Sequence, residues 1–140
     1  MNLYAESSAV IAWLFGEPAG KDVRAALAGA ETVVSSDLTL VECERVLIRA
    51  VALGKITEAQ AADRRAVLSA AAARWHILKV AGDVVERARR PFPKEPIRTL
   101  DALHLSGALV ARSALAGVEL LSLDERIRDN ARALGFRSLP

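Results

Sequence analysis

The order of apolar and polar residues along the chain alternates between two periods. Short apolar runs of strand length are separated by longer segments in which apolar residues recur at helical spacing. The predicted strands are residues 2–5, 32–35, 75–80, 118–123 and 136–139. The predicted helices are residues 8–15, 21–28, 38–53, 57–73, 83–90, 100–113 and 125–134. Strand and helix therefore alternate over nearly the whole chain.

Boundary residues support these segments. Gly54 is placed to end one helix, Thr57 and Gln60 have the spacing of a capping box, and Thr99 is expected to cap the helix over 100–113. The prolines at 91, 93 and 96 predict a connector without helix. Strands joined by helices imply right-handed crossovers and a mostly parallel sheet. We expect a single domain over residues 1–140, a three-layer α/β/α fold with a central sheet of about five strands.

Composition narrows the class of protein. The chain has 140 residues, of which 52% are hydrophobic and 26% charged, so disorder is excluded, and charges interrupt every apolar run before it reaches membrane-spanning length. Aromatic residues make up only 4%, which argues against a base-stacking platform. The single cysteine, Cys43, excludes an internal disulfide and is interpreted as a small buried hydrophobe. Met1–Ala5 lacks the features of a signal peptide. A cytoplasmic protein that does not enter membranes is expected.

Four acidic residues follow predicted strands or begin predicted helices: Glu6, Glu42, Asp101 and Asp124. A parallel sheet of this kind binds ligands beyond the carboxyl ends of its strands, so these carboxylates are predicted to converge there. Each also has a purely structural interpretation, because acidic residues favour the first turn of a helix. All four falling at one edge by chance is much less probable than any one alone.

Clustered carboxylates repel one another unless a cation neutralises them. Oxygen ligands without nearby histidine or cysteine ligands favour Mg²⁺ or Mn²⁺ over zinc. Such an ion activates water and stabilises charge on phosphoryl oxygens. Ser8 and Ser122 are candidates to orient these ligands, while a helix cap is the alternative for Ser8. The histidine at 104 shares a helix face with Asp101 but is interpreted as a packing residue.

Four stretches resemble the motifs of PIN-domain nucleases, in order and across essentially the whole chain. They are Leu-Tyr-Ala-Glu-Ser-Ser at 3–8, Ser-Ser-Asp-Leu-Thr-Leu-Val-Glu at 35–42, Leu-Asp-Ala-Leu-His-Leu at 100–105 and Leu-Ser-Leu-Asp-Glu-Arg at 121–126. The third is the most specific and is similar to that of VapC-type toxins. The resemblance implies a metal-dependent endoribonuclease, the toxin of a toxin–antitoxin pair, in which Glu6, Glu42, Asp101 and Asp124 hold one or two Mg²⁺ or Mn²⁺ ions.

The resemblance also implies partners. RNA would be cleaved to a 5′-phosphate and a 3′-hydroxyl, a cognate antitoxin would wrap the toxin, and a homodimer is expected. Trp13, Leu14 and Phe15 are core residues or one wall of the groove that receives the antitoxin. The basic run from Arg87 to Arg98 is interpreted as a solvated face, with a phosphate track as the alternative.

Two positions remain open. The first acid of the family is usually Asp, whereas position 6 is Glu, which favours a weakly catalytic PIN-fold RNA-binding module as the alternative function. A helical wheel places Glu44 rather than Glu42 towards the apolar side, but the motif register favours Glu42.

A receiver-like regulatory domain is a further alternative, although it requires adjacent acids after the first strand. The net charge of +2 becomes 19 − 13, or +6, once the four acids are assigned to metal.

Overall fold

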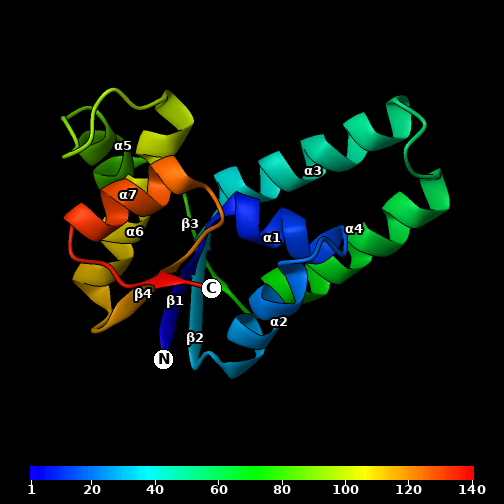
Figure 1. The fold of residues 1–140 in the computed structure, drawn as a ribbon, viewed down its shortest axis with the longest axis horizontal. Coiled ribbons are helices and arrows are strands. Elements are labelled where there is room, and N and C mark those ends of the chain that lie inside the picture. Colours follow the sequence, from blue (N-terminus) through cyan, green and yellow to red (C-terminus); the bar gives the residue numbers. More distant parts are fainter.

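Five short apolar segments form one parallel β-sheet in the computed structural model, which describes residues 1–140 (Figure 1). The strands are β1 (Asn2–Ala5), β2 (Thr32–Ser36), β3 (His76–Leu78), β4 (Val118–Leu121) and β5 (Ser138–Leu139). Their order in the sheet is β3-β2-β1-β4-β5, and every pair is parallel. The prediction of a parallel five-stranded sheet is confirmed.

Seven helices cover the two faces of this sheet. They are α1 (Ser7–Leu14), α2 (Gly20–Gly29), α3 (Asp37–Ala52), α4 (Glu58–Ala72), α5 (Gly82–Ala88), α6 (Thr99–Ala114) and α7 (Glu125–Ala133). In Figure 1, α5, α6 and α7 lie on one side of the sheet, and α1 and α2 lie on the other with the hairpin of α3 and α4, which extends beyond the sheet. The three-layer α/β/α architecture is confirmed.

Alternating residues of the central strands build two separate cores. Tyr4 and Leu120 are fully buried against the α6 side, whereas Leu3 and Leu121 are fully buried against the α1 side. Burial on both faces explains why these strands read as nearly continuous apolar runs in the sequence.

Helix ends follow the sequence signals with one exception. Thr57 and Gln60 form the predicted capping box, and Gly54 follows α3 with φ 70°. Thr99, however, does not cap α6. It is the first residue of that helix, and Arg98 occupies the N-cap without a side-chain hydrogen bond, because the chain leaves the extended conformation one residue earlier than predicted.

None of the helices combines the length and apolar character needed to cross a membrane.

The strand order decides where a site can form. The central strand β1 pairs with β2 on one side and with β4 on the other. The first half of the chain therefore adds strands on one side of β1, and the second half adds strands on the other side. Ligands of open α/β sheets bind in the crevice beyond the carboxyl ends of the strands at such a reversal. The residues that follow β1, β2 and β4 meet there.

Candidate active site

An acidic cleft of about 550 Å³ opens beyond the carboxyl end of β1. All four acids predicted from the sequence line it, contributed by the end of β1, by α3, by α6 and by the end of β4. The lining residues are Glu6, Ser7, Ser8, Ile11, Glu42, Arg98, Thr99, Leu100, Asp101, His104 and Asp124. The structure therefore brings Glu6, Glu42, Asp101 and Asp124 to one cavity.

Glu6 is almost completely buried, with 2% of its surface exposed, and it is held by hydroxyl groups. Its Oε1 accepts hydrogen bonds from Ser7 Oγ at 2.7 Å and from the Ser8 backbone N–H at 3.1 Å. Its Oε2 accepts from Ser122 Oγ at 2.7 Å and from the Ser8 hydroxyl. Glu6 is also the N-cap of α1, so the alternative in which Ser8 caps this helix is wrong. These donors stabilise a buried charge that would otherwise be very costly.

Glu42 of α3 is held by His104 of α6. The His104 Nε2 lies 2.5 Å from Glu42 Oε1, and Ser7 Oγ lies 3.2 Å from the same oxygen. A carboxylate only accepts, so the imidazole proton is on Nε2, and Nδ1 is left buried without a partner. Because Ser7 also donates to Glu6, it links the carboxylates of β1 and α3.

Asp101 is different, since its Oδ2 is buried and has no hydrogen-bond partner. Burial raises the pKa of Asp101 above its usual value, and the negative charges of Asp124 and then Glu6 add to the effect, while a hydrogen bond from the Arg98 backbone and the charge of Arg126 partly offset it. A partly buried carboxylate that has one oxygen without a partner and lies among like charges is a candidate functional group.

Asp124 caps α7 through Oδ1, which accepts from the backbone N–H groups of Arg126 at 2.9 Å and Ile127 at 3.2 Å. Ser122 accepts a hydrogen bond from the Asp124 N–H at 3.2 Å while donating to Glu6. The structural and functional interpretations of Asp124 therefore hold together: one oxygen caps the helix, and the residue still lines the cleft.

We tested whether these residues fit a divalent cation. No three acidic, histidine or cysteine side chains lie close enough together to ligate one ion at once. Mg²⁺, however, keeps several waters and is commonly bound through only one or two carboxylates together with substrate phosphates. The unpartnered Asp101 Oδ2 and the mutual repulsion of the acids are what such an ion would relieve. The all-oxygen donor set fits Mg²⁺ or Mn²⁺.

The structure also separates Glu42 from Glu44. Glu44 lies outside the cleft, where its Oε2 accepts a hydrogen bond from Arg65 Nε on α4 at 2.8 Å. The helical-wheel preference for Glu44 is wrong, because α3 packs against α4 as well as α1 and has no single buried side.

The three residues proposed for an antitoxin groove do not line a common cavity. Leu14 is buried in the core between α1 and the sheet, so its assignment to a partner groove is wrong. Trp13 lines a hollow of about 480 Å³ beside α2 and α4. Phe15 lines another of about 420 Å³ beside α3, with the Arg64 guanidinium 4.8 Å from its ring centroid.

Two residues of the site were missed from the sequence. Ser7 was not considered, and His104 was interpreted as a packing residue, although both contact Glu6 or Glu42. His104 is indeed buried, with 2% exposed, so the packing interpretation described its environment and not its partner. The nearest available signal was the spacing of three between Asp101 and His104, which puts both on one face of α6.

Comparison with known proteins agrees with this geometry. The PIN domain family model matches residues 3–133. Ribonuclease VapC46 of Mycobacterium tuberculosis is 35% identical over 134 residues, which cover 96% of this chain and 93% of that protein.

Two solved structures share the fold. VapBC2 from Rickettsia felis, crystallised with a DNA fragment from its promoter, superposes with a TM-score of 0.66 at 11% identity, covering 99% of this chain and 97% of its own. VapC20 of M. tuberculosis, a toxin that cleaves the sarcin–ricin loop, gives a TM-score of 0.65 at 15% identity, covering 96% and 95%. The match over nearly the whole chain excludes a receiver-like domain, and the protein belongs to the PIN-domain family of ribonucleases, among the VapC homologues.

Proposed function

We propose that this protein is a metal-dependent endoribonuclease that acts as the toxin of a toxin–antitoxin pair. The observation that carries the proposal is the cleft in which Glu6, Glu42, Asp101 and Asp124 converge, with Asp101 Oδ2 buried and unpartnered. The homology to Ribonuclease VapC46 supports the same activity.

Glu6, Glu42, Asp101 and Asp124 would hold Mg²⁺ or Mn²⁺. When bound, the cation supplies an activated water and stabilises negative charge on the phosphoryl oxygens. The chain itself fixes the carboxylates: Ser7, Ser8 and Ser122 orient Glu6, and His104 and Ser7 orient Glu42. Such supporting hydrogen bonds commonly change metal affinity or activity by about 10–100-fold when removed.

The reaction is hydrolysis of an RNA phosphodiester. Water adds to phosphorus, the bond from phosphorus to the 3′ oxygen breaks, and that oxygen takes up a proton, which leaves a 5′-phosphate and a 3′-hydroxyl. Asp101 Oδ2 is the buried carboxylate oxygen of the cleft that is free to accept a hydrogen bond from water. Because the substrate is RNA, we expect the protein to act inside the cell.

The test compares the wild type with three variants, two of which lie on the same helix, α3. Purified protein is incubated with RNA in Mn²⁺, in Mg²⁺ and in EDTA, beside Glu42→Gln, Glu44→Gln and Asp101→Asn variants. Wild-type and Glu44→Gln protein are expected to cleave in either metal, because Glu44 lies on the Arg65 side of α3. EDTA, Glu42→Gln and Asp101→Asn are expected to abolish cleavage. Equal cleavage in EDTA would overturn the metal-nuclease proposal, and binding of RNA without cleavage in any condition would support a noncatalytic module.

The proposal includes an antitoxin and a second copy of the chain. The Rickettsia neighbour is a VapBC complex, which supports an antitoxin partner here. Apolar side chains remain exposed on this side: Ile48 of α3 is 45% exposed, Leu53 just after α3 is 56% exposed and Val67 of α4 is 48% exposed. Trp13 and Phe15 line hollows beside these helices. We expect this side to be covered in the antitoxin complex, and light scattering of the free protein tests the homodimer.

A further inference from the structure

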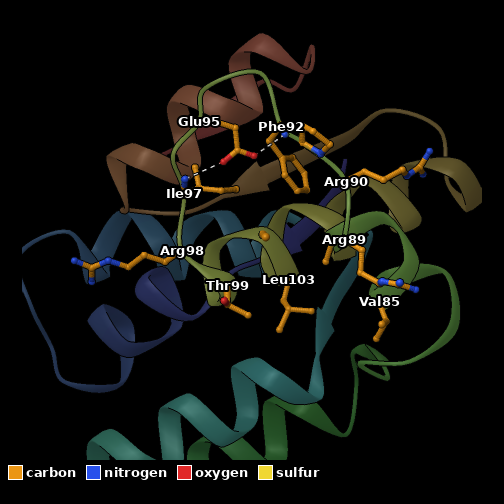
Figure 2. A pocket seen from close by; sticks show the side chains of 12 residues that line it. Val85, Arg89, Arg90, Phe92, Glu95, Ile97, Arg98, Thr99 and Leu103 are labelled. Carbon is orange, nitrogen blue, oxygen red and sulfur yellow. Dashed lines mark hydrogen bonds between the residues drawn. The ribbon is translucent and has the colours of Figure 1, made fainter.

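A second pocket of about 470 Å³ lies next to the acidic cleft, between α5, the proline-containing connector and the start of α6 (Figure 2). Its walls include Val85, Phe92, Ile97 and Leu103, and Arg98 lies at its edge. Neither the proposed reaction nor its metal ligands use this pocket.

The connector that forms the pocket is fixed by paired hydrogen bonds at two of its residues, Glu95 and Lys94. Glu95 accepts from the backbone N–H groups of Phe92 and Ile97, both at 2.9 Å, as the dashed lines in Figure 2 show. The Lys94 N–H donates to Asn130 Oδ1 at 2.8 Å, and Asn130, which is 1% exposed, donates back to the Lys94 carbonyl at 3.2 Å. The pocket is therefore formed before any ligand binds.

The pocket combines an apolar interior with a positively charged rim. In Figure 2, Val85 and Leu103 project beneath the connector, Arg98 extends to one side, and Arg89 and Arg90 extend to the other. Arg90 and Arg98 make no ion pair, and Arg89 makes only an exposed one of 3.5 Å with Glu86. The one acid of the pocket, Glu95, already accepts from two backbone amides.

An apolar cavity beside unpaired guanidinium groups matches the two halves of a nucleotide. An unpaired base has flat apolar faces that can pack on apolar side chains, and its phosphate carries the negative charge. Arg87 covers the Phe92 ring, with 4.1 Å from its guanidinium carbon to the ring centroid, while Arg90 and Arg98 remain available for phosphate.

The pocket adjoins the acidic cleft, because Arg98 and Thr99 line both cavities. A single strand with its scissile phosphate beside Asp101 would pass Arg98 before reaching the pocket. We propose that this pocket is a subsite for the unpaired base of a nucleotide one step beyond those that flank the scissile phosphate, and that Arg98 binds the phosphate that joins this nucleotide to its flanking neighbour. The inference rests on the proposed ribonuclease activity and makes this pocket a determinant of RNA sequence preference.

The first experiment uses a random-sequence RNA pool, with sequencing of the cleaved ends. Val85→Phe fills the pocket from a residue that is 38% exposed, and Val67→Phe, at a 48% exposed position on α4, is its matched control. Arg98→Gln removes the proposed phosphate contact, and Arg24→Gln on α2 removes an equal charge outside the cleft. Stacking of a base is worth about 1–3 kcal/mol, so Val85→Phe should cleave about 5- to 150-fold more slowly, and Arg98→Gln should also cleave more slowly than Arg24→Gln.

Wild-type protein is expected to show a base preference at one position, one nucleotide beyond those that flank the cut. Val85→Phe should lose it, and the two controls should keep both rate and preference. A second substrate replaces that nucleotide with an abasic ribose. It should slow wild-type cleavage to the rate of Val85→Phe and leave the Val85→Phe rate unchanged.

Failure of this inference is separable from failure of the ribonuclease. If wild-type protein cleaves and Asp101→Asn does not, but Val85→Phe and Arg98→Gln keep the wild-type rate and preference, the subsite is overturned and the activity stands. If Val85→Phe instead changes only antitoxin binding or the oligomeric state, the pocket is a protein interface, and the subsite is overturned as well.

Discussion

Gly107 lies in α6, one turn after His104, and its lack of a side chain allows the helix to approach the central strand closely. A Cβ added at this position would lie 3.0 Å from Tyr4 Cζ and even closer to the Tyr4 hydroxyl. Tyr4 is fully buried in β1, two residues before Glu6, so its ring cannot simply move out into solvent. Gly107→Ala must therefore displace α6 from β1 or turn the Tyr4 ring within the core.

The cost follows from this clash. Overpacking of a dense core typically costs about 1–3 kcal/mol. For a domain of 140 residues, each kcal/mol lowers Tm by about 3 °C, so Gly107→Ala should melt about 3–10 °C below the wild type. Displacement of α6 moves Asp101 and His104 away from Glu6. Because a misplacement of about 1 Å can cost 100-fold in rate, cleavage should fall by up to about that factor.

Tyr4→Phe provides the decisive comparison. The Tyr4 hydroxyl is buried without a partner, so its removal should be neutral or stabilising, and it takes away the atom that the added methyl group would meet first. The double variant should recover most of the Tm lost by Gly107→Ala. The assay is thermal denaturation followed by circular dichroism, in EDTA.

Gly29→Ala, at the end of α2, is the control, because a Cβ there meets nothing within 4 Å. This substitution should be neutral or stabilising by up to about 1 kcal/mol. Strictly additive effects of Tyr4→Phe and Gly107→Ala would refute the proposed contact, as would a Gly107→Ala protein as stable as Gly29→Ala.

Further predictions concern the acidic cleft. Glu6→Asp shortens a side chain that is held by buried hydroxyl groups, so the free energy of unfolding in EDTA should fall by about 1–3 kcal/mol, seen as a lower Tm. Cleavage should not rise, and a faster enzyme would contradict this prediction. The pKa of Asp101 is raised on folding, so its ionisation opposes folding as pH rises above the unfolded pKa. Asp101→Asn should therefore raise Tm at pH 7 in EDTA. The variant should also lose the increase of about 8 °C that Mn²⁺ at 100 times its Kd gives the wild type, as measured by differential scanning calorimetry. His104→Ala should weaken Mn²⁺ binding about 10–100-fold in isothermal titration, with partial recovery in His104→Gln, which retains a donor; unchanged affinity would show that His104 does not position Glu42. Burial raises the pKa of Cys43 to about 12, so the native protein should not react with a thiol reagent at pH 8 until it unfolds, and rapid reaction would show that this core opens.

The fold was predictable because its signals are local. Each strand is a short apolar run, and the caps at Thr57 and Asp124 need only three or four consecutive residues. Thr99 failed because the preceding backbone, and not the residue type, determines where α6 begins. The local sequence pattern thus predicts which segments are helices and strands, whereas their exact ends depend on the tertiary structure.

The site was predictable only in part, because its hydrogen bonds cross long stretches of chain. Convergence of the four acids followed from the parallel sheet alone. The partner of Glu42, in contrast, is 62 residues away, and no local pattern indicates that His104 faces it. Glu44 shows the opposite error: a helical wheel assumes one buried side, whereas α3 contacts both α1 and α4, and Arg65 of α4 takes up the Glu44 charge.

The hydrogen bonds of the cleft also rank its four acids. Glu6 is stabilised by serine hydroxyls, Glu42 by His104, and Asp124 by the first backbone amides of α7. These three carboxylates therefore have partners without a cation. Asp101 has a buried oxygen with none, and the charges around it raise its pKa. A bound cation would relieve the greatest electrostatic cost at Asp101, so metal affinity should depend on this residue more steeply than on the other three.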